Sequence, residues 1–127
     1  MAVSDGFVEY LRERLASVPG LRLRRMFGGI GVYAGERFFG IVADDTLYLR
    51  LAPRDLEAAR AGAAVPFSYA RGTRRVVMDA YHAVPADVLE DDDRLAGWAA
   101  RAVEEAASGP VARRRSSIPG RKASKTQ

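Results

Sequence analysis

Residues 24–33 read Arg24-Arg25-Met26-Phe27-Gly28-Gly29-Ile30-Gly31-Val32-Tyr33, and this stretch decides the fold that we expect. Its three glycines lie between two apolar segments, in an order that resembles a phosphate-binding loop. Such a loop opens a helix whose N-terminal amides receive the phosphates. Here the chain runs instead through Gly35-Glu36 into a second strand-like segment, residues 37–43. The glycines are therefore interpreted as a bend between strands.

The segments around this bend alternate between helical and extended patterns. Apolar residues about 3.6 positions apart predict helices, and alternation of apolar with polar residues predicts strands. In chain order we expect a helix over 7–18 capped by Ser4 or Asp5, strands over 21–27, 30–34, 38–43 and 46–51, a short helix over 54–61 after Pro53, a hairpin of strands 67–70 and 74–81, and a helix over 95–106 preceded by Asp91-Asp92-Asp93. Short turns between strands favour antiparallel pairing. The sequence thus predicts an α+β domain with a mainly antiparallel sheet.

The composition indicates one small domain followed by a basic tail. The 127 residues include no cysteine, which excludes disulfides and thiol catalysis and is compatible with a reducing cytoplasm. No apolar run approaches the length of a membrane span, so we expect a soluble, cytoplasmic protein with no membrane partner. Residues 1–109, the predicted domain, hold 14 basic and 16 acidic residues. Residues 110–127 hold six basic residues, no acidic ones and few large apolar ones, so we expect a disordered tail.

The third predicted strand is apolar on both of its faces. Strict alternation places Phe39 and Ile41 on one face and Phe38 and Val42 on the other. Three helices can cover only one face of the sheet, so either one helix crosses to the far side or a second copy of the chain covers it. The second alternative predicts a homodimer whose dimer face includes Phe38, Val42 and Tyr48.

Several separated blocks of sequence agree in order and spacing with a known family. They are residues 25–33, 38–44, 47–49, 67–69, 81–85, 89–91 and 98–99. Together they resemble the N-terminal domain of the TfoX/Sxy family over nearly the whole predicted domain. The resemblance implies a two-layer fold similar to secretion chaperones, in the order α-β(3)-α-β(2)-α. In that order the first two strand segments would form one bent strand or an irregular lead-in.

The resemblance also implies a class of function. Full-length members are bacterial regulators of natural competence that act with the cyclic-AMP receptor protein at competence promoters, and they carry a second, helical domain. After Ser108 this chain has only the basic tail, so we expect a single-domain member that serves as a regulatory or protein-interaction module linked to transcription regulation. We expect a partner protein to contact the rim around the glycine bend, which is formed by Arg24, Arg25, Met26, Phe27, Gly28, Gly29, Gly31 and Tyr33.

The residues favour a binding protein over an enzyme. His82 is the only histidine, and although Asp79 or Asp87 could orient it, no serine lies in a G-x-S-x-G context. The run Glu90-Asp91-Asp92-Asp93 is the only dense acidic cluster, and we interpret it as a solvated helix start rather than a metal site. We therefore predict no enzymatic activity, no cofactor and no metal.

Non-specific nucleic-acid binding is the alternative function. The cations of the tail could neutralise phosphates without reading the sequence, which gives weak and salt-dependent binding. These cations are Arg113, Arg114, Arg115, Arg121, Lys122 and Lys125. On the domain itself, Arg22, Arg24, Arg74 and Arg75 would form a basic strip if their strands were neighbours.

Overall fold

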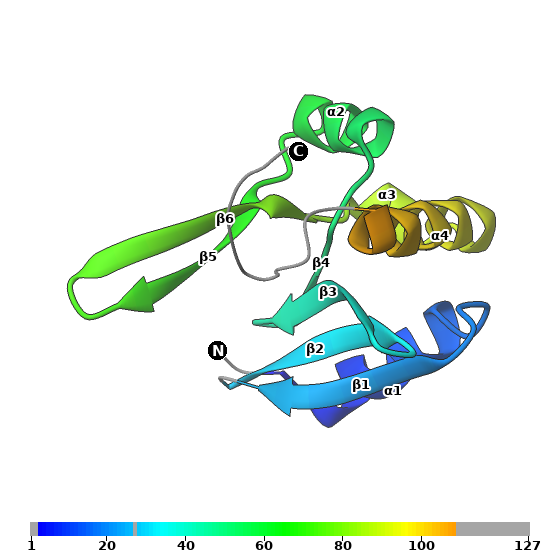
Figure 1. Ribbon diagram of the computed structural model, residues 1–127, viewed down its shortest axis with the longest axis horizontal. Coiled ribbons are helices and arrows are strands. Elements are labelled where there is room, and N and C mark those ends of the chain that lie inside the picture. The colour runs from blue at the N-terminus through cyan, green and yellow to red at the C-terminus, as the bar shows by residue number, and fades with distance from the viewer. Residues whose placement is uncertain (1–2, 27, 109–127) are drawn as a thin grey trace.

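The structure, a computed structural model, describes residues 3–26 and 28–108. Its elements are α1 (Asp5–Arg14), β1 (Leu21–Met26), β2 (Gly29–Ala34), β3 (Arg37–Ala43), β4 (Thr46–Leu49), α2 (Pro53–Ala61), β5 (Pro66–Arg71), β6 (Arg74–Ala83), α3 (Ala86–Leu89) and α4 (Asp92–Ser108) (Figure 1). The strands form one antiparallel sheet in the order β1-β2-β3-β4-β6-β5. This confirms the predicted α+β class. The predicted tail lies outside the described residues.

The number of strands before α2 agrees with the prediction from the residue pattern, which is four, rather than with the three strands that the family resemblance implies. Four separate strands precede α2, as the alternation of residues predicts. Strands β1 and β2 pair in register from Leu21 opposite Ala34 to Met26 opposite Gly29. They are therefore two strands of a hairpin and not one bent strand. The short helix α3 has no counterpart among the predicted elements.

Side-chain caps fix where two of the helices begin. The Ser4 hydroxyl accepts a hydrogen bond from the Phe7 N–H at 3.2 Å, which caps α1. The N–H and hydroxyl of Ser4 also donate to the Asp45 carboxylate, at 2.8 and 3.1 Å, and so tie the β3–β4 turn to α1. At the start of α4, the Asp91 carboxylate accepts a hydrogen bond from the Arg94 N–H at 3.1 Å. Both caps lie where the sequence predicts them.

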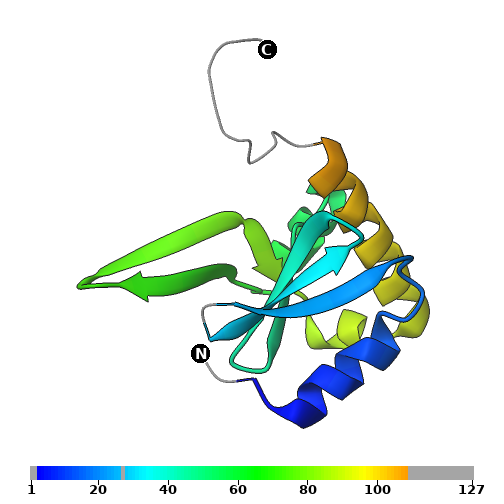
Figure 2. The same cartoon turned by 60° about the horizontal axis from the view of Figure 1, so that its bottom comes forward.

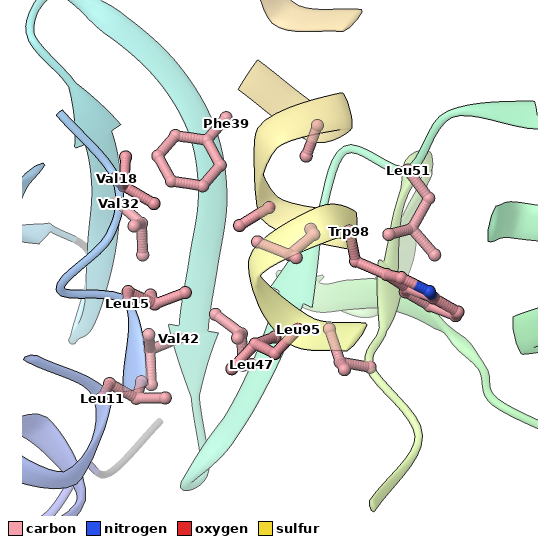
Figure 3. Packing of buried hydrophobic residues seen from close by; sticks show 14 of the residues in the cluster. Leu11, Leu15, Val18, Val32, Phe39, Val42, Leu47, Leu51, Leu95 and Trp98 are labelled. Atoms are coloured by element: carbon pink, nitrogen blue, oxygen red, sulfur yellow. The ribbon is translucent and has the colours of Figure 1, made fainter. Parts of the chain in front are cut away.

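All helices cover the same face of the sheet (Figure 2). Buried residues of α1, α2, α3 and α4 belong to one apolar cluster with residues of β2, β3 and β4, so none of these four helices crosses to the far side. Figure 3 shows Leu11 of α1, Leu15 directly after α1, and Leu95 and Trp98 of α4 within this core. We call the opposite side of β1–β4 the open face.

A bulge in β3 sets which side chains reach the open face. Val32 pairs with Gly40 and Tyr33 pairs with Phe38, so Phe39 has no partner on β2. Such an extra residue shifts the alternation of side chains between the two faces. Phe39 consequently lies in the helix-side core, whereas Ile41 lies in a second buried cluster on the open face.

The hairpin of β5 and β6 projects from the sheet (Figure 1). β6 pairs with β4 only at Ala83 and His82. Pro66 pairs with His82 but Phe67 pairs with Met78, so residues 79–81 have no partner on β5. We call the part beyond this irregularity, residues 67–78, the arm. The arm is a two-stranded ribbon joined to the sheet by a short ladder.

Within residues 3–26 and 28–108, no helix has the length and apolar content that a membrane span requires.

Candidate functional site

The open face carries arginine and aromatic side chains next to the glycine bend. The register of β1 against β2 places Arg22 opposite Tyr33, and alternation puts Arg24 and Met26 on the same face. Phe38 of β3 lies beside Tyr33. We call these five side chains the arginine–aromatic patch.

The side chains of the patch contact one another. The rings of Tyr33 and Phe38 have their centroids 5.2 Å apart. The guanidinium carbons of Arg22 and Arg24 lie 5.8 and 5.9 Å from the centroid of the Tyr33 ring, within the range of cation–π attraction. Tyr33 and Phe38 are half-buried and both arginines are exposed. The patch therefore presents parts of two aromatic rings and two cationic groups to solvent together.

Aromatic side chains continue from the patch across the open face toward the arm. Phe38 lies 5.5 Å from Tyr81 of β6, measured between ring centroids. In a second row, the ring centroids of Tyr48 of β4 and Phe67 of β5 lie 5.2 Å apart, and those of Phe67 and Tyr69 lie 6.0 Å apart. Phe67 and Tyr81 are buried, so the base of the arm covers part of the open face. The arginine–aromatic patch lies on the β1–β3 part of this face.

Tyr81 lies where the aromatic row meets the arm. Burial raises the pKa of its hydroxyl above the usual range, and a hydrogen bond and the positive charge of Arg50 act in the opposite direction. The net shift is upward, so the hydroxyl stays protonated at neutral pH.

Glycine makes room for the patch. A Cβ atom at Gly31 would lie 2.5 Å from the Met26 sulfur and 3.1 Å from ring carbons of both Phe38 and Tyr33. A Cβ at Gly29 would lie 2.6 Å from the carbonyl oxygen of Val42 on β3. These glycines permit close approach within the sheet. The glycine run thus shapes the backbone between and within strands, as the sequence predicts.

The structure divides the predicted interaction rim between several places. Arg25 lies on the helix side of β1, where it pairs with Asp5 of α1 at 3.7 Å. Gly28 has a positive φ of 80° in the β1–β2 turn. Phe27 lies outside the described residues. The members that share the open face are Arg24, Met26, Gly29, Gly31 and Tyr33.

The predicted dimer face requires a correction. Phe38 and Tyr48 pack together with the second cluster on the open face. Val42 instead belongs to the helix-side core and is 1% exposed, so it cannot face a second copy. Strict alternation fails here because of the bulge at Phe39, and Ile41 takes the position on the open face that was assigned to Val42.

Charge is segregated between the two layers. Residues 21–51 and 66–83, which form the sheet and its turns, hold eight arginines and four acidic residues. Helices α1, α3 and α4 with the α3–α4 link hold ten acidic residues and four arginines. The sheet layer is therefore positive and the helical layer negative, although the domain as a whole is close to neutral.

The predicted basic strip is not continuous in the sheet. Arg22 and Arg24 lie on β1 and Arg74 and Arg75 lie on β6, and three strands separate β1 from β6. Arg75 donates a hydrogen bond to the Ser68 hydroxyl across the arm, at 3.0 Å. The two pairs of arginines form separate positive areas. The six predicted tail cations lie outside the described residues.

His82 lies in the interior of the domain. It is 2% exposed, and its Nδ1 has no hydrogen-bond partner among the described residues. Asp87, a candidate partner, pairs instead with Arg94 at 3.1 Å. The geometry of a Ser-His-Asp triad, in which a carboxylate holds Nδ1, is therefore not formed with Asp87.

His82 should make the stability of the protein fall in acid. Burial lowers the pKa of His82 and the positive charge of Arg60 lowers it further, whereas Asp79 acts in the opposite direction. Below the unfolded-state pKa of about 6.5 the unfolded chain binds a proton that the folded chain rejects, so the free energy of unfolding decreases as the pH falls, by at most about 1.4 kcal/mol per pH unit. Urea unfolding followed by Trp98 fluorescence, at about pH 7.5 and 5.5, measures this loss. His82→Gln should show a smaller loss, and an equal loss in both proteins would contradict the assignment.

The acidic run at the start of α4 has structural partners. Asp91 caps the helix and Asp92 pairs with Arg14 of α1, which also donates two hydrogen bonds to the Leu89 carbonyl. Within the part of the chain that the structure describes, no three His, Asp or Glu side chains are grouped as ligands of a metal ion. The run thus anchors α1 to α3 and α4.

Sequence reasoning missed the aromatic residues that the arm contributes to the open face. Phe67 and Tyr69 of the arm and Tyr81 at its base pack on the open face, next to the irregular pairing of residues 79–81. The alternation of Phe67 and Tyr69 with Ser68 was a signal that both rings share one face. No signal in the sequence indicated which face of the sheet this would be.

Comparison with known protein families identifies one matching family. The family model described as the TfoX N-terminal domain matches residues 13–106, which include β1 to β6 and most of α4. A comparison with curated proteins found no match.

Proposed function

Because the chain belongs to the TfoX N-terminal domain family, we propose that it is a non-enzymatic regulatory module that acts in the cytoplasm through contacts with proteins. The likeness to competence regulators supports a link to transcription regulation. The first protein contact that we propose is with a second copy of the chain. The observation that carries this proposal is the arm.

The arm has free edges and exposed apolar side chains. β5 is the outermost strand, and β6 pairs with β4 only at Ala83 and His82, so both edges of the arm lack a strand partner within the described residues. Val77 on the arm and Val65 before its base are 51% and 58% exposed. A two-stranded ribbon is marginally stable alone, and free edges favour pairing with another chain. Antiparallel pairing of two arms would give a symmetric four-stranded sheet.

Charge also favours the arm over the rest of the open face as the contact. Two copies meeting through their arginine–aromatic patches would bring Arg22 and Arg24 of both copies together, which is unfavourable. Antiparallel pairing of two β5 strands separates Arg71 of one copy from Arg71 of the other, since each lies at the end of its strand. A protein partner other than a second copy remains a prediction from the family resemblance.

We expect light scattering over a range of micromolar concentrations to give twice the mass of the 13.8 kDa chain. Val77 lies opposite Ser68 of β5, so Val77→Asp places a charge beside the β5 contact of each copy and should weaken association about tenfold. Tyr10→Ser is the matched control, because Tyr10 is also a large, exposed apolar residue but lies on α1 in the helical layer. A wild-type monomer at every concentration would refute the dimer. An effect of Tyr10→Ser equal to that of Val77→Asp would refute the arm as its interface.

A second candidate function is non-specific nucleic-acid binding through the tail. The observation in its favour is the presence of six cations and no acidic residue in residues 110–127. A full-length variant with glutamine at all six positions should then lose most of its salt-dependent affinity for DNA.

A further inference from the structure

The open face differs from the helical layer in both charge and side-chain chemistry. The sheet and its turns carry twice as many arginines as acidic residues, and the helices carry the reverse excess. An anionic macromolecule would therefore approach the sheet side of the domain. The arginine–aromatic patch is the part of this side that combines cations with half-buried rings.

The two arginines of the patch are available to a ligand. Arg22 donates a hydrogen bond to the Gly35 carbonyl at 3.2 Å and lies 3.8 Å from the carboxylate of Glu36, whose side chain is 98% exposed. Such an exposed ion pair contributes little to stability, so a phosphate group of a ligand can replace the Glu36 carboxylate. Among the described residues no carboxylate lies within 4.0 Å of the Arg24 guanidinium, whose carbon lies 5.9 Å from the Tyr33 ring centroid. Both guanidinium groups keep free donors for phosphate oxygens.

The rings of the patch suit a ligand with planar groups. Tyr33 and Phe38 stand above β2 and β3 of an antiparallel sheet whose other face is covered by helices. Gly31 between them lets the rings settle close to the backbone. In other antiparallel sheets covered by helices on one face, aromatic side chains on the free face stack with unpaired bases. Arginine guanidinium planes also stack with bases.

We propose that the arginine–aromatic patch binds single-stranded nucleic acid, with bases stacked against Tyr33 and Phe38 and phosphates held by Arg22 and Arg24. A duplex keeps its bases inside its own stack and so gains nothing from the rings. A peptide of acidic residues alone would use the arginines but has no aromatic groups to stack on the rings. The combination on one face therefore favours the single strand.

This site is independent of the proposed dimer, since it lies on β1–β3 and the arm is formed by β5 and β6. It is also separate from the tail, although tail cations would add attraction for the same polymer. The test must therefore separate the patch from both.

Fluorescence anisotropy of a labelled oligothymidine, titrated with the full-length protein over a salt series, measures the affinity. Arg22→Gln with Arg24→Gln should weaken binding about tenfold and reduce the slope of log affinity against log salt by about 1.4. Tyr33→Leu and Phe38→Leu, which keep apolar bulk but remove the ring, should each weaken binding about tenfold with an unchanged slope. Arg54→Gln with Arg60→Gln on α2 removes the same charge from the helical layer and should have a much smaller effect.

Three comparisons decide between the patch and its alternatives. In a background with glutamine at the six tail positions, the effects of the patch variants should persist; their disappearance would refute the patch as the site. A duplex of the same length should bind more weakly and be insensitive to Phe38→Leu; equal binding by duplex would refute stacking. Polyglutamate should compete poorly, and competition as strong as that of unlabelled oligothymidine would assign the face to acidic peptides instead. If the wild-type protein is a dimer but does not bind oligothymidine, the single-strand proposal fails and the proposed protein-interaction function is unaffected.

Unfolding curves show whether each variant is folded. Trp98 lies in the helix-side core at 5% exposure, far from the open face, so its emission reports folding without reporting the ligand. Patch variants with wild-type unfolding midpoints and wild-type DNA affinity would overturn the proposal.

Discussion

Arg101→Ala should lower the free energy of unfolding by about 3 kcal/mol, because it leaves a buried carboxylate without its partner. Arg101 of α4 donates two hydrogen bonds to Asp55 of α2, from Nε at 2.7 Å and from Nη2 at 3.1 Å. The Asp55 side chain is 5% exposed, whereas that of Arg101 is 32% exposed. The paired carboxylate also raises the pKa of Arg101, which stays charged throughout the accessible range. We place the cost at the lower end of the range for buried pairs because water reaches the arginine.

Urea unfolding followed by Trp98 fluorescence measures this cost. Arg94→Ala is the matched control, since Arg94 is an arginine of the same helix whose pair with Asp87 at 3.1 Å is exposed. Loss of that exposed pair should cost less than about 1 kcal/mol. Asp55→Leu combined with Arg101→Met should recover much of the stability, because two apolar side chains leave no buried charge. If Arg101→Ala cost no more than Arg94→Ala, the carboxylate of Asp55 would have to be solvated.

Gly29→Val should destabilise the domain by about 3 kcal/mol, at the upper end of the usual cost of overpacking. The first added carbon already lies 2.6 Å from the Val42 carbonyl oxygen, which is an atom of the β3 backbone and cannot rotate away. The two strands would have to separate where Ile30 pairs with Val42 in the middle of the sheet. Thermal unfolding followed by circular dichroism measures the change.

The control for this substitution is a glycine with free space around it. A Cβ at Gly6 in α1 would meet no atom within 4 Å, so Gly6→Ala should raise stability by up to about 1 kcal/mol through helix propensity. A Gly29→Val protein as stable as the wild type would show that β2 and β3 are less tightly paired than their register indicates.

The sequence predicts the elements well because each depends on local signals. Ser4 and Asp91 mark helix starts by their hydrogen bonds to the backbone three residues on, and Pro53 occupies the first turn of α2. The register between β1 and β2 is uninterrupted, so Arg22 and Tyr33 lie opposite each other on one face. These features involve residues close together in the chain.

The parts that the sequence does not predict depend on pairing between distant strands. The bulge at Phe39 is defined by the pairing of β3 with β2, and the residues Phe38-Phe39-Gly40 carry no sequence pattern that predicts it. The arm turns at residues 79–81 because β5 and β6 lose register there, which brings Phe67 to Tyr48. The charge pair between Asp55 and Arg101 spans 46 positions of sequence. Only the packed structure brings these groups together.

The bulge at Phe39 has a consequence for how substitutions in β3 should be interpreted. Side chains of a strand alternate between the two faces of the sheet, and the extra residue reverses this alternation, so even-numbered residues before and after the bulge lie on opposite faces. An even-numbered position before it, Phe38, lies on the open face, and an even-numbered position after it, Val42, lies in the helix-side core. Among relatives, a polar residue at the position of Val42 would then disturb the helix-side core, whereas the same residue at the position of Ile41 would disturb the second buried cluster, on the open face.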